Sequence, residues 1–600
     1  MLSDVDIRIK RYADKFTELK AAFQGRAIVQ TGITVQRILN KVENLGTPFH
    51  CRDLFHVLHL YIAAEVDLND MPYAEGARFD SEKGCLPGTR EEVIDEITNW
   101  VNSDGDHVPC VFFLSGLAGS GKSAIAHTVA SRFHELGRLG SSFFFDRAYS
   151  TDRRPDNLFS TIARDLADLD PQRKRSLWEL IQGQRALRTT RSAREQFDQF
   201  ILNPSSKLMA VGPMVIVIDA LDESGDPAAR KALLAVLVDQ VVHLPFNFRI
   251  LVTSRPERDI QTALSGKRHV VYKGMDTIDV MSTKSDISRF VRAELAAVHG
   301  LNHKWPNEAW RHLLAERSEG LFQWASTACL FIKGDGQEGL DPSEQLDIIL
   351  SLTPLVTKSN HLDQLYLEIL MRTFGTKNAT VMNRFKAIMG RLLAAREPLS
   401  VFTLREMWSG CDLSDAIRLI IPPLGSLLSG VGQNFVPVRP LHTSFRDFLT
   451  DPERSGPFYV EVSAHHRSLV VATLRIMKTG LRFNICHLET SHVRNCDIPD
   501  LAARIEGNIP AHLSYACQFW ADHLQGIAFD SDILEGVKEF LLQQLLYWLE
   551  VLSLINEPSS ASKGLKFLLD WNQVSHFRTY QVLWTWFLTA TAISCKTMHL

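Results

Sequence analysis

Five short apolar runs between residues 110 and 275 constrain the fold of this chain more than any other feature. They are rich in β-branched and aromatic residues, and stretches with helical periodicity separate them: VFFLS (111–115), SFFFD (142–146), MVIVID (214–219), FRILVTS (248–254) and HVVY (269–272). Strands that are apolar along their whole length are buried on both faces, which is typical of a parallel sheet covered by helices. The pattern therefore predicts an α/β domain over this region.

Length and composition bound the rest of the molecule. A chain of 600 residues is long enough for about four domains. With 45% hydrophobic and 22% charged residues, it is not a disordered chain, a collagen or a coiled-coil rod. The 65 basic and 69 acidic residues leave a net charge of −4, which excludes a protein whose whole surface attracts nucleic acid or membranes. After residue 275 the chain has helical patterns almost to its end, apart from a possible short hairpin at 435–442.

The two ends of the chain and its cysteines support fewer conclusions about the protein. Residues 1–66 carry a heptad-like apolar pattern, which fits either a helical hairpin packed on its own domain or a module for oligomerisation or partner binding. The stretch 582–594 is apolar but shorter than the ~20 residues of a spanning helix, so we expect no membrane span. The nine cysteines include no CxxC pair, and the first residues lack the apolar core of a secretory signal. We therefore expect reduced thiols and a cytoplasmic location.

One motif follows the first apolar run directly. The sequence GLAGSGKS matches G-x-x-x-x-G-K-[ST], and the helical stretch SAIAHTVASRF comes after it. Glycines let such a loop fold around phosphate oxygens, with its amide groups pointing inward at the start of a helix. The lysine supplies a charge for the β- and γ-phosphates, and the serine hydroxyl can bind Mg²⁺. The predicted nucleotide-binding residues here are Gly116, Gly119, Ser120, Gly121, Lys122 and Ser123.

A second group of polar residues follows two of the later runs. In VIVIDALDE, Asp219 ends the run, where it is suited to hold Mg²⁺ through water together with Ser123. Either Asp222 or Glu223 would orient the attacking water as the catalytic carboxylate, and the sequence does not decide between them. Arg255 closes the run FRILVTS at the carboxyl edge of the sheet, where a guanidinium can contact the terminal phosphate.

Taken together, GLAGSGKS, VIVIDALDE and LVTSRPE resemble the NACHT branch of the STAND P-loop ATPases. The resemblance is closer to the NACHT proteins of mushroom-forming fungi, often described as having a nephrocystin-like N-terminal nucleotide-binding domain. It covers about residues 85 to 520, and four flanking stretches fit it: CLPGTREEVIDEI (85–97), GLFQWASTACLFI (320–332), LDQLYLEIL (362–370) and PLHTSFRDFL (440–449).

This resemblance implies a multidomain α/β plus α protein. A P-loop NTPase parallel sheet is followed by a helical domain, a winged helix and further helices. The boundaries we expect are an N-terminal helical region (1–66), a linker (67–90), the nucleotide-binding domain (91–275), a small helical domain (276–375), a winged-helix domain (376–452) and a C-terminal helical region (453–600).

The resemblance also implies one site residue outside the nucleotide-binding domain. In such proteins a winged-helix histidine reaches the β-phosphate of ADP and locks the resting state, and the matching residue here is His442. Related switches have Met-His-Asp at this place, whereas this chain has Leu441-His442-Thr443, so only the role of the histidine carries over. From its position we expect Thr443 to cap the helix SFRDFL.

The function that the resemblance implies is an NLR-like signalling switch, of the kind known from innate immunity. ATP/ADP exchange with Mg²⁺ would control conformation and self-association, and slow ATP hydrolysis would reset the switch. Two alternatives remain open: a nucleotide-binding scaffold with negligible hydrolysis, and a conventional turnover ATPase. The protein or ligand that triggers the switch and its downstream output are not identifiable from the sequence, and no stretch indicates a nucleic-acid partner.

Overall fold

The computed structural model describes residues 68, 71–103, 105, 107–149, 153–205, 212–296, 298, 307–334, 341–351, 361–409, 412–490, 493 and 495–573. The expected N-terminal helical region and the apolar stretch 582–594 lie outside these residues. None of the helices within the described ranges has the length and apolar character needed to cross a bilayer.

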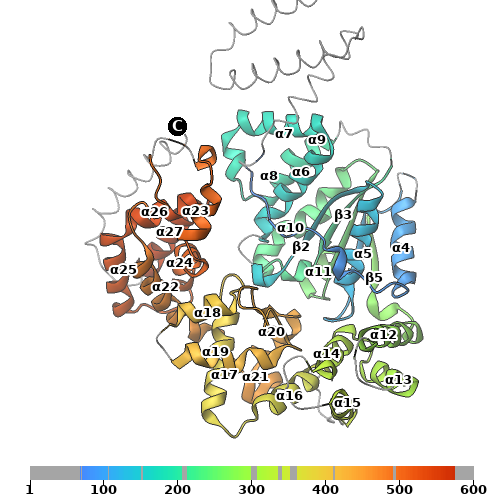
Figure 1. Cartoon of the computed structure of the whole chain (residues 1–600). Coiled ribbons are helices and arrows are strands. Elements are labelled where there is room, and N and C mark those ends of the chain that lie inside the picture. Colours follow the sequence, from blue (N-terminus) through green and yellow to red (C-terminus); the bar gives the residue numbers. More distant parts are fainter. Residues whose placement is uncertain are drawn as a thin grey trace, which may run out of the picture.

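A five-stranded parallel sheet forms the α/β domain (Figure 1). The strands are β1 (Val111–Ser115), β2 (Leu139–Phe144), β3 (Met214–Asp219), β4 (Phe248–Ser254) and β5 (Val270–Gly274), in the spatial order β2-β3-β4-β1-β5. The predicted sheet is therefore confirmed, but the bounds of two strands differ from the predicted runs: β2 covers 139–144 instead of 142–146, and β5 covers 270–274 instead of 269–272. Strand β2 begins three residues before the predicted run because it includes Gly140, where a side chain would collide with Leu166 and Met214. Glycine weakens a strand signal in the sequence.

Alternate residues of each strand enter two separate cores. On β1, Val111 and Phe113 face one core, and Phe112 and Leu114 face the other. Helices α4 (Glu91–Asn102) and α5 (Lys122–Glu135) cover the second face. The first face is covered by α6 (Leu158–Leu169), α7 (Pro171–Gly183), α8 (Ala193–Gln196), α10 (Pro227–Asp239) and α11 (Arg258–Leu264), and the short α9 (Asn203–Ser205) follows α8 in the chain after a π-helical turn. Burial on both faces is the physical reason that the strands are apolar without alternation.

The helices after the sheet begin beside the loop that follows β1. They are α12 (Val280–Leu295), α13 (Glu308–Arg317), α14 (Phe322–Lys333), α15 (Pro342–Ser351) and α16 (His361–Phe374). The backbone N–H of Gln323, at the start of α14, donates to the carbonyl of Gly119 at 3.1 Å. This helical unit is thus in direct contact with the glycine-rich loop.

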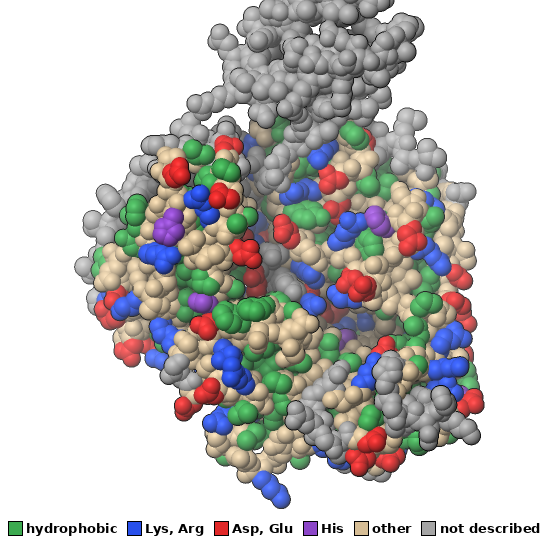
Figure 2. Space-filling model, viewed as in Figure 1, with side chains coloured by type: hydrophobic (Ala, Val, Ile, Leu, Met, Phe, Trp, Pro, Cys, Tyr) green, Lys and Arg blue, Asp and Glu red, His purple; other side chains and the backbone are tan. Residues whose placement is uncertain are grey.

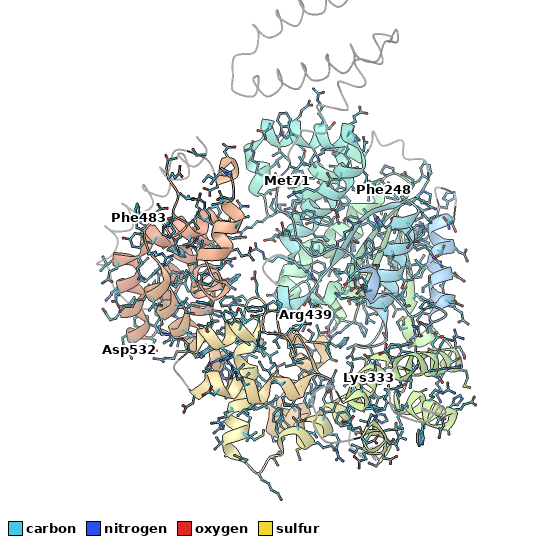
Figure 3. All side chains as sticks on the ribbon, viewed as in Figure 1. Met71, Phe248, Lys333, Arg439, Phe483 and Asp532 are labelled. Carbon is cyan, nitrogen blue, oxygen red and sulfur yellow. The ribbon has the colours of Figure 1, made fainter. Side chains whose placement is uncertain are left out.

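A winged-helix arrangement comes next. Helices α17 (Ala379–Ala394), α18 (Val401–Met407) and α19 (Asp412–Ile420) precede an antiparallel hairpin of β6 (Leu428–Ser429) and β7 (Arg439–Pro440), and α20 (Thr443–Leu449) follows. The hairpin expected at 435–442 is displaced: that segment contains only β7, and its partner strand β6 lies before it, at 428–429. Arg439 lies where this unit meets the α/β domain (Figure 3), 3.8 Å from the carboxylate of Asp146.

The short α21 (Pro452–Ser455) packs against α20 and α16. The remaining helices stack beyond the winged helix: α22 (His466–Gly480), α23 (Leu501–Asn508), α24 (Ala511–Leu524), α25 (Ser531–Gln543), α26 (Leu545–Leu554) and α27 (Ser559–Gln573). One contiguous apolar core runs from Ile287 on α12 to Trp571 on α27. The expected small helical domain, winged-helix domain and C-terminal helical region all share this core. No break in the core marks where one of them ends, so the boundaries expected from the sequence stay predictions. Acidic and basic side chains are mixed over the face seen in Figure 2, in keeping with the nearly balanced charge.

Candidate nucleotide site

The glycine-rich loop joins β1 to α5 at the carboxyl edge of the sheet. Gly119 and Gly121 have positive φ values of 80° and 96°, which residues with a Cβ seldom adopt. A Cβ on Gly116 would lie 2.6 Å from Met275, and one on Gly119 equally close to Gln323. No side chain caps the start of α5, so its first amide groups remain available to an anion.

Lys122 sits in this loop as a buried cation. Its Nζ donates to the carbonyls of Gly116 at 2.7 Å and Leu117 at 2.9 Å. Burial lowers the pKa of Lys122 to about 8. Among the residues that the structure describes, no carboxylate lies within 4.0 Å of this ammonium. The buried Ser120 hydroxyl also lacks a partner. A phosphate would supply the anion that both groups lack, so the loop fits a nucleotide.

Asp219 ends strand β3 next to the loop. Its carboxylate accepts a hydrogen bond from the Thr253 hydroxyl, and the Ser123 hydroxyl bonds to it as well. Burial raises the pKa of Asp219 above its usual value. Ser123 and Asp219 therefore meet where a Mg²⁺ ion would be held. No group of three or more His, Cys, Asp or Glu within the described ranges could hold a metal, so such an ion would depend on phosphate and water for its other ligands.

The sheet order, the loop between β1 and α5, and the carboxylate at the end of β3 decide the fold. It is that of a P-loop NTPase.

In this P-loop NTPase, the two candidate catalytic carboxylates have different surroundings. Asp222 is committed to Arg255: it accepts from the Arg255 backbone N–H at 2.9 Å and lies 3.2 Å from its Nε. Within the described residues, Glu223 accepts one long hydrogen bond, from the backbone N–H of Arg147 at 3.3 Å. Burial, with the nearby charges of Asp222 and Asp146, raises the pKa of Glu223 to about 7. Glu223 thus keeps the capacity to accept a proton near neutral pH.

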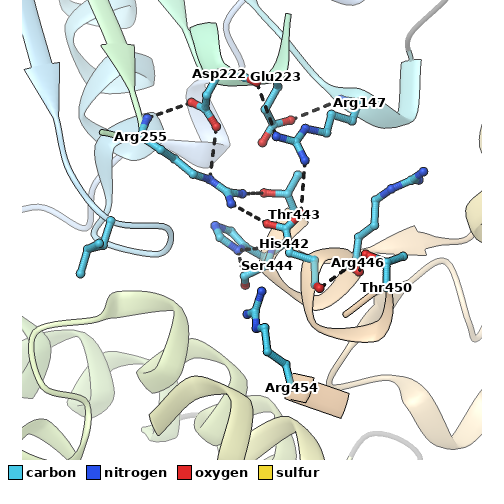
Figure 4. A network of polar contacts seen from close by, with 12 residues as sticks. Arg147, Asp222, Glu223, Arg255, His442, Thr443, Ser444, Arg446, Thr450 and Arg454 are labelled. Carbon is cyan, nitrogen blue, oxygen red and sulfur yellow. Dashed lines mark hydrogen bonds and ion pairs between the residues drawn. The ribbon is translucent and has the colours of Figure 1, made fainter. Parts of the chain in front are cut away.

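Arg255 lies at the edge of the sheet, and its guanidinium group contacts the winged helix. Its Nη1 donates to Asp447, its Nη2 donates to the Thr443 hydroxyl at 2.7 Å, and its Nε faces Asp222 (Figure 4). The sequence predicted the place of Arg255 at the edge of the sheet, but its partners on α20 are 188 and 192 residues further along the chain. No local pattern could have indicated them.

His442 lies at the start of α20 and is itself the helix cap. Its Nδ1 accepts from the Ser444 backbone N–H at 3.1 Å, whereas Thr443 bonds to Arg255, so the expected Thr443 cap is wrong. Accepting through Nδ1 leaves the ring proton on Nε2. Burial, and then the charges of Arg255 and Lys122, lower the pKa of His442 to about 4. The ring is therefore neutral, with one N–H to donate.

A cavity of about 420 Å³ brings these parts together. Of the predicted site residues, its lining contains Gly119, Gly121, Lys122, Ser123, Asp222, Glu223, Arg255 and His442. The other three contact this lining: Gly116 accepts from Lys122, Asp219 bonds to Ser123, and the Ser120 carbonyl accepts from Arg90, which also lines the cavity. The assigned roles of these residues remain predictions.

One wall of the cavity was not anticipated from the sequence. It is formed by residues 83–86, 89 and 90 together with Phe290, Phe322 and Gln323. Arg90 joins these segments: it donates to Thr283 at 2.9 Å and to the Ser120 carbonyl at 3.0 Å, and its guanidinium lies 4.9 Å from the centre of the Phe322 ring. The only signal in the sequence is the stretch CLPGTREEVIDEI, whose contact with α12 and α14 depends on the fold.

Comparisons with known proteins bear on part of the chain. The model of the family described as nephrocystin 3, N-terminal, matches residues 88–255, which include the loop, Asp219 and Arg255. A search of curated proteins finds no match. Solved structures that the chain resembles include PCH-2 of C. elegans, with 16% identity and a TM-score of 0.28, covering 48% of this chain and 71% of that one. Drosophila ORC bound to poly(dA/dT) DNA and Cdc6 has 11% identity and a TM-score of 0.21, covering 77% and 69%.

Proposed function

We propose that this chain is a NACHT-type signalling switch whose conformation depends on whether ADP or ATP occupies the cavity. The observation that carries the proposal is that His442 of the winged helix and Lys122 of the glycine-rich loop line one cavity. A ligand held by both would join the two units, and losing either contact would let them separate. This is a two-state element that a ligand biases through contacts made in one state only.

The residues divide the task as follows. Lys122 and the amide groups at the start of α5 bind phosphate, and Ser123 with Asp219 holds Mg²⁺, which neutralises charge on the β- and γ-phosphates. His442 donates through Nε2 to the diphosphate and holds the winged helix closed. Glu223 accepts the proton of the attacking water, so that hydrolysis returns the switch to its resting state.

The second candidate function is a conventional turnover ATPase. The surroundings of Glu223 support this candidate. Its carboxylate has a pKa of about 7, which suits a general base at neutral pH. The two functions differ in rate and in the nucleotide that is retained. A switch turns over slowly and keeps ADP, whereas a turnover enzyme releases it.

One set of measurements separates these functions. The full chain is purified, its bound nucleotide is identified, its steady-state ATPase rate is determined, and its sedimentation is compared with ADP and with a non-hydrolysable ATP analogue. We expect retained ADP, slow turnover, and self-association with the analogue alone. Fast turnover without retained ADP would favour the turnover enzyme.

The matched variants are Lys122→Ala and Lys273→Ala. Lys122→Ala removes the cation of the loop and should abolish binding of both nucleotides. Lys273→Ala removes a lysine of the same domain that pairs with Glu96 at the edge of the sheet, and should leave binding intact. Equal affinity in wild type and Lys122→Ala would refute the nucleotide site.

A further inference from the structure

The carboxylate of Asp447 is held by two arginines of the nucleotide-binding domain. One oxygen accepts from Arg147 at 3.2 Å and the other from Arg255 at 2.5 Å. Asp447 comes from α20 of the winged helix, while Arg147 and Arg255 lie beyond β2 and β4 of the sheet. A single acidic side chain thus bridges two units through charge-assisted hydrogen bonds, which are stronger than neutral ones.

All three nitrogens of the Arg255 guanidinium group are already engaged. Nε faces Asp222, Nη1 donates to Asp447 and Nη2 donates to Thr443. Arg255 also lines the cavity beside Lys122. The guanidinium group keeps two further N–H groups, so a terminal phosphate that reaches Arg255 shares its charge with the carboxylates of Asp222 and Asp447 and is repelled by the Asp447 carboxylate. A diphosphate bound at the loop and His442 has no γ-phosphate and does not compete with Asp447 for Arg255.

The position of Asp447 on its helix explains why it meets Arg255. Thr443 and Asp447 are four residues apart on α20, so they lie on the same helix face one turn apart. Both contact the same guanidinium group. This chain has Thr443 directly after the histidine, and its acidic group comes one turn later.

We propose that Asp447 determines the nucleotide specificity of the site, favouring a nucleoside diphosphate over a triphosphate because it occupies Arg255. This inference rests on the proposed function. The γ-phosphate competes with the Asp447 carboxylate for Arg255, and when Arg255 turns to the phosphate, that carboxylate loses one of its two cations next to Asp222 and Glu223. The winged helix separates from the sheet as a consequence.

The test compares affinities for ADP and for a non-hydrolysable ATP analogue, both with Mg²⁺, by titration of the nucleotide-free full chain. The variants are Asp447→Asn and Asp447→Ser, which remove the charge, and Asp146→Asn as the matched control. Asp146 pairs with Arg439 across the same interface, but has no contact with Arg255 among the described residues. We expect both Asp447 variants to bind the analogue about ten- to a hundredfold more tightly relative to ADP, and Asp146→Asn to leave this ratio unchanged.

Each other outcome counts against the proposal. An unchanged ratio in the Asp447 variants, or an equal shift in Asp146→Asn, would overturn the specificity role. Loss of ADP binding in both Asp447 variants would overturn it too, because Asp447 would then serve the fold. If the wild type binds neither nucleotide, the proposed function itself fails, and that result is visible before any variant is made.

Discussion

At the scale of single residues, the adjacent carboxylates of Asp222 and Glu223 have different surroundings, which suit them to different roles. Asp222 is held by the backbone and side chain of Arg255, whereas Glu223 has one weak backbone donor and a raised pKa of about 7. The Asp222 carboxylate is already paired with Arg255 and is less free to contact a water molecule. Glu223 is therefore the better candidate for activating water.

We predict that Glu223→Gln slows single-turnover ATP hydrolysis by about a hundredfold or more while leaving nucleotide binding intact, because an amide cannot accept the proton. Asp222→Asn should retain more of the rate. The wild-type rate should rise up to about tenfold from pH 6 to pH 8, because a group with a pKa near 7 becomes deprotonated over this range. A full rate in Glu223→Gln would contradict this assignment.

At the scale of elements, two helices depend on histidines that are neutral when buried. His442 caps α20, and His127 on α5 accepts from the Asp80 backbone N–H at 3.0 Å while its ring stacks on Phe144 at 3.9 Å. Burial lowers the pKa of both to about 4. Each histidine accepts its hydrogen bond through an unprotonated ring nitrogen, His442 from its own helix and His127 from the segment before α4, so both contacts require the uncharged ring.

We predict that His442→Leu releases ADP faster and destabilises the chain by about 1 kcal/mol, because it removes the cap of α20 as well as the donor to phosphate. His442→Asn restores an acceptor for the Ser444 N–H but is too short to replace the imidazole in the cavity. It should recover stability without recovering the slow ADP release. Stopped-flow release of a fluorescent ADP and thermal unfolding measure the two effects, and an unchanged release rate in His442→Leu would exclude the lock.

A second prediction at this scale concerns pH. Because the pKa of His127 is lower in the folded state, the unfolded chain takes up the proton between about pH 6.5 and 4, and the contribution of His127 to stability falls as the pH drops through this window. Wild type should lose about 2 kcal/mol more than His127→Asn between pH 7 and pH 5. Urea unfolding of both chains at the two pH values checks this, and parallel losses would contradict it.

At the scale of the whole molecule, charge pairs join the sheet to the winged helix at the mouth of the cavity. Arg147 and Arg255 pair with Asp447, and Asp146 pairs with Arg439. Such contacts can exchange partners when an anion enters, whereas the apolar core between α12 and α27 cannot be opened without a large loss of buried surface. If the winged helix moves away from the sheet, we therefore expect the two to part at these charge pairs.

We predict that the amides of α20 exchange hydrogen more slowly with ADP than with a non-hydrolysable ATP analogue, because ADP keeps the winged helix closed on the sheet. Exchange in β3 and β4 should not differ, since these strands are buried in both states. Exchange measured by mass spectrometry in both nucleotides tests this, with Lys122→Ala as the control that responds to neither. Equal exchange of α20 in the two nucleotides would exclude the movement.

The sequence by itself determined the sheet, the loop and the carboxylates that follow it. Unbroken apolar runs are a local property, and they predicted all five strands, with the bounds of β2 and β5 displaced by one to three residues. The phosphate-binding motif is local as well, because its glycines, lysine and serine act within a few residues of one another. The helical character after residue 275 also follows from periodicity.

Only the tertiary structure decided which residues meet across the cavity. Arg255 reaches Asp447, His442 enters the lining beside Lys122, and Arg90 bonds to Thr283 and Ser120. It also decided that His442 caps α20 and that Glu223, unlike Asp222, remains unpaired with an arginine side chain in the described part of the chain. These contacts join segments many residues apart, and burial sets their pKa values. Neither the approach of distant segments nor the loss of water around a charge is encoded in local spacing.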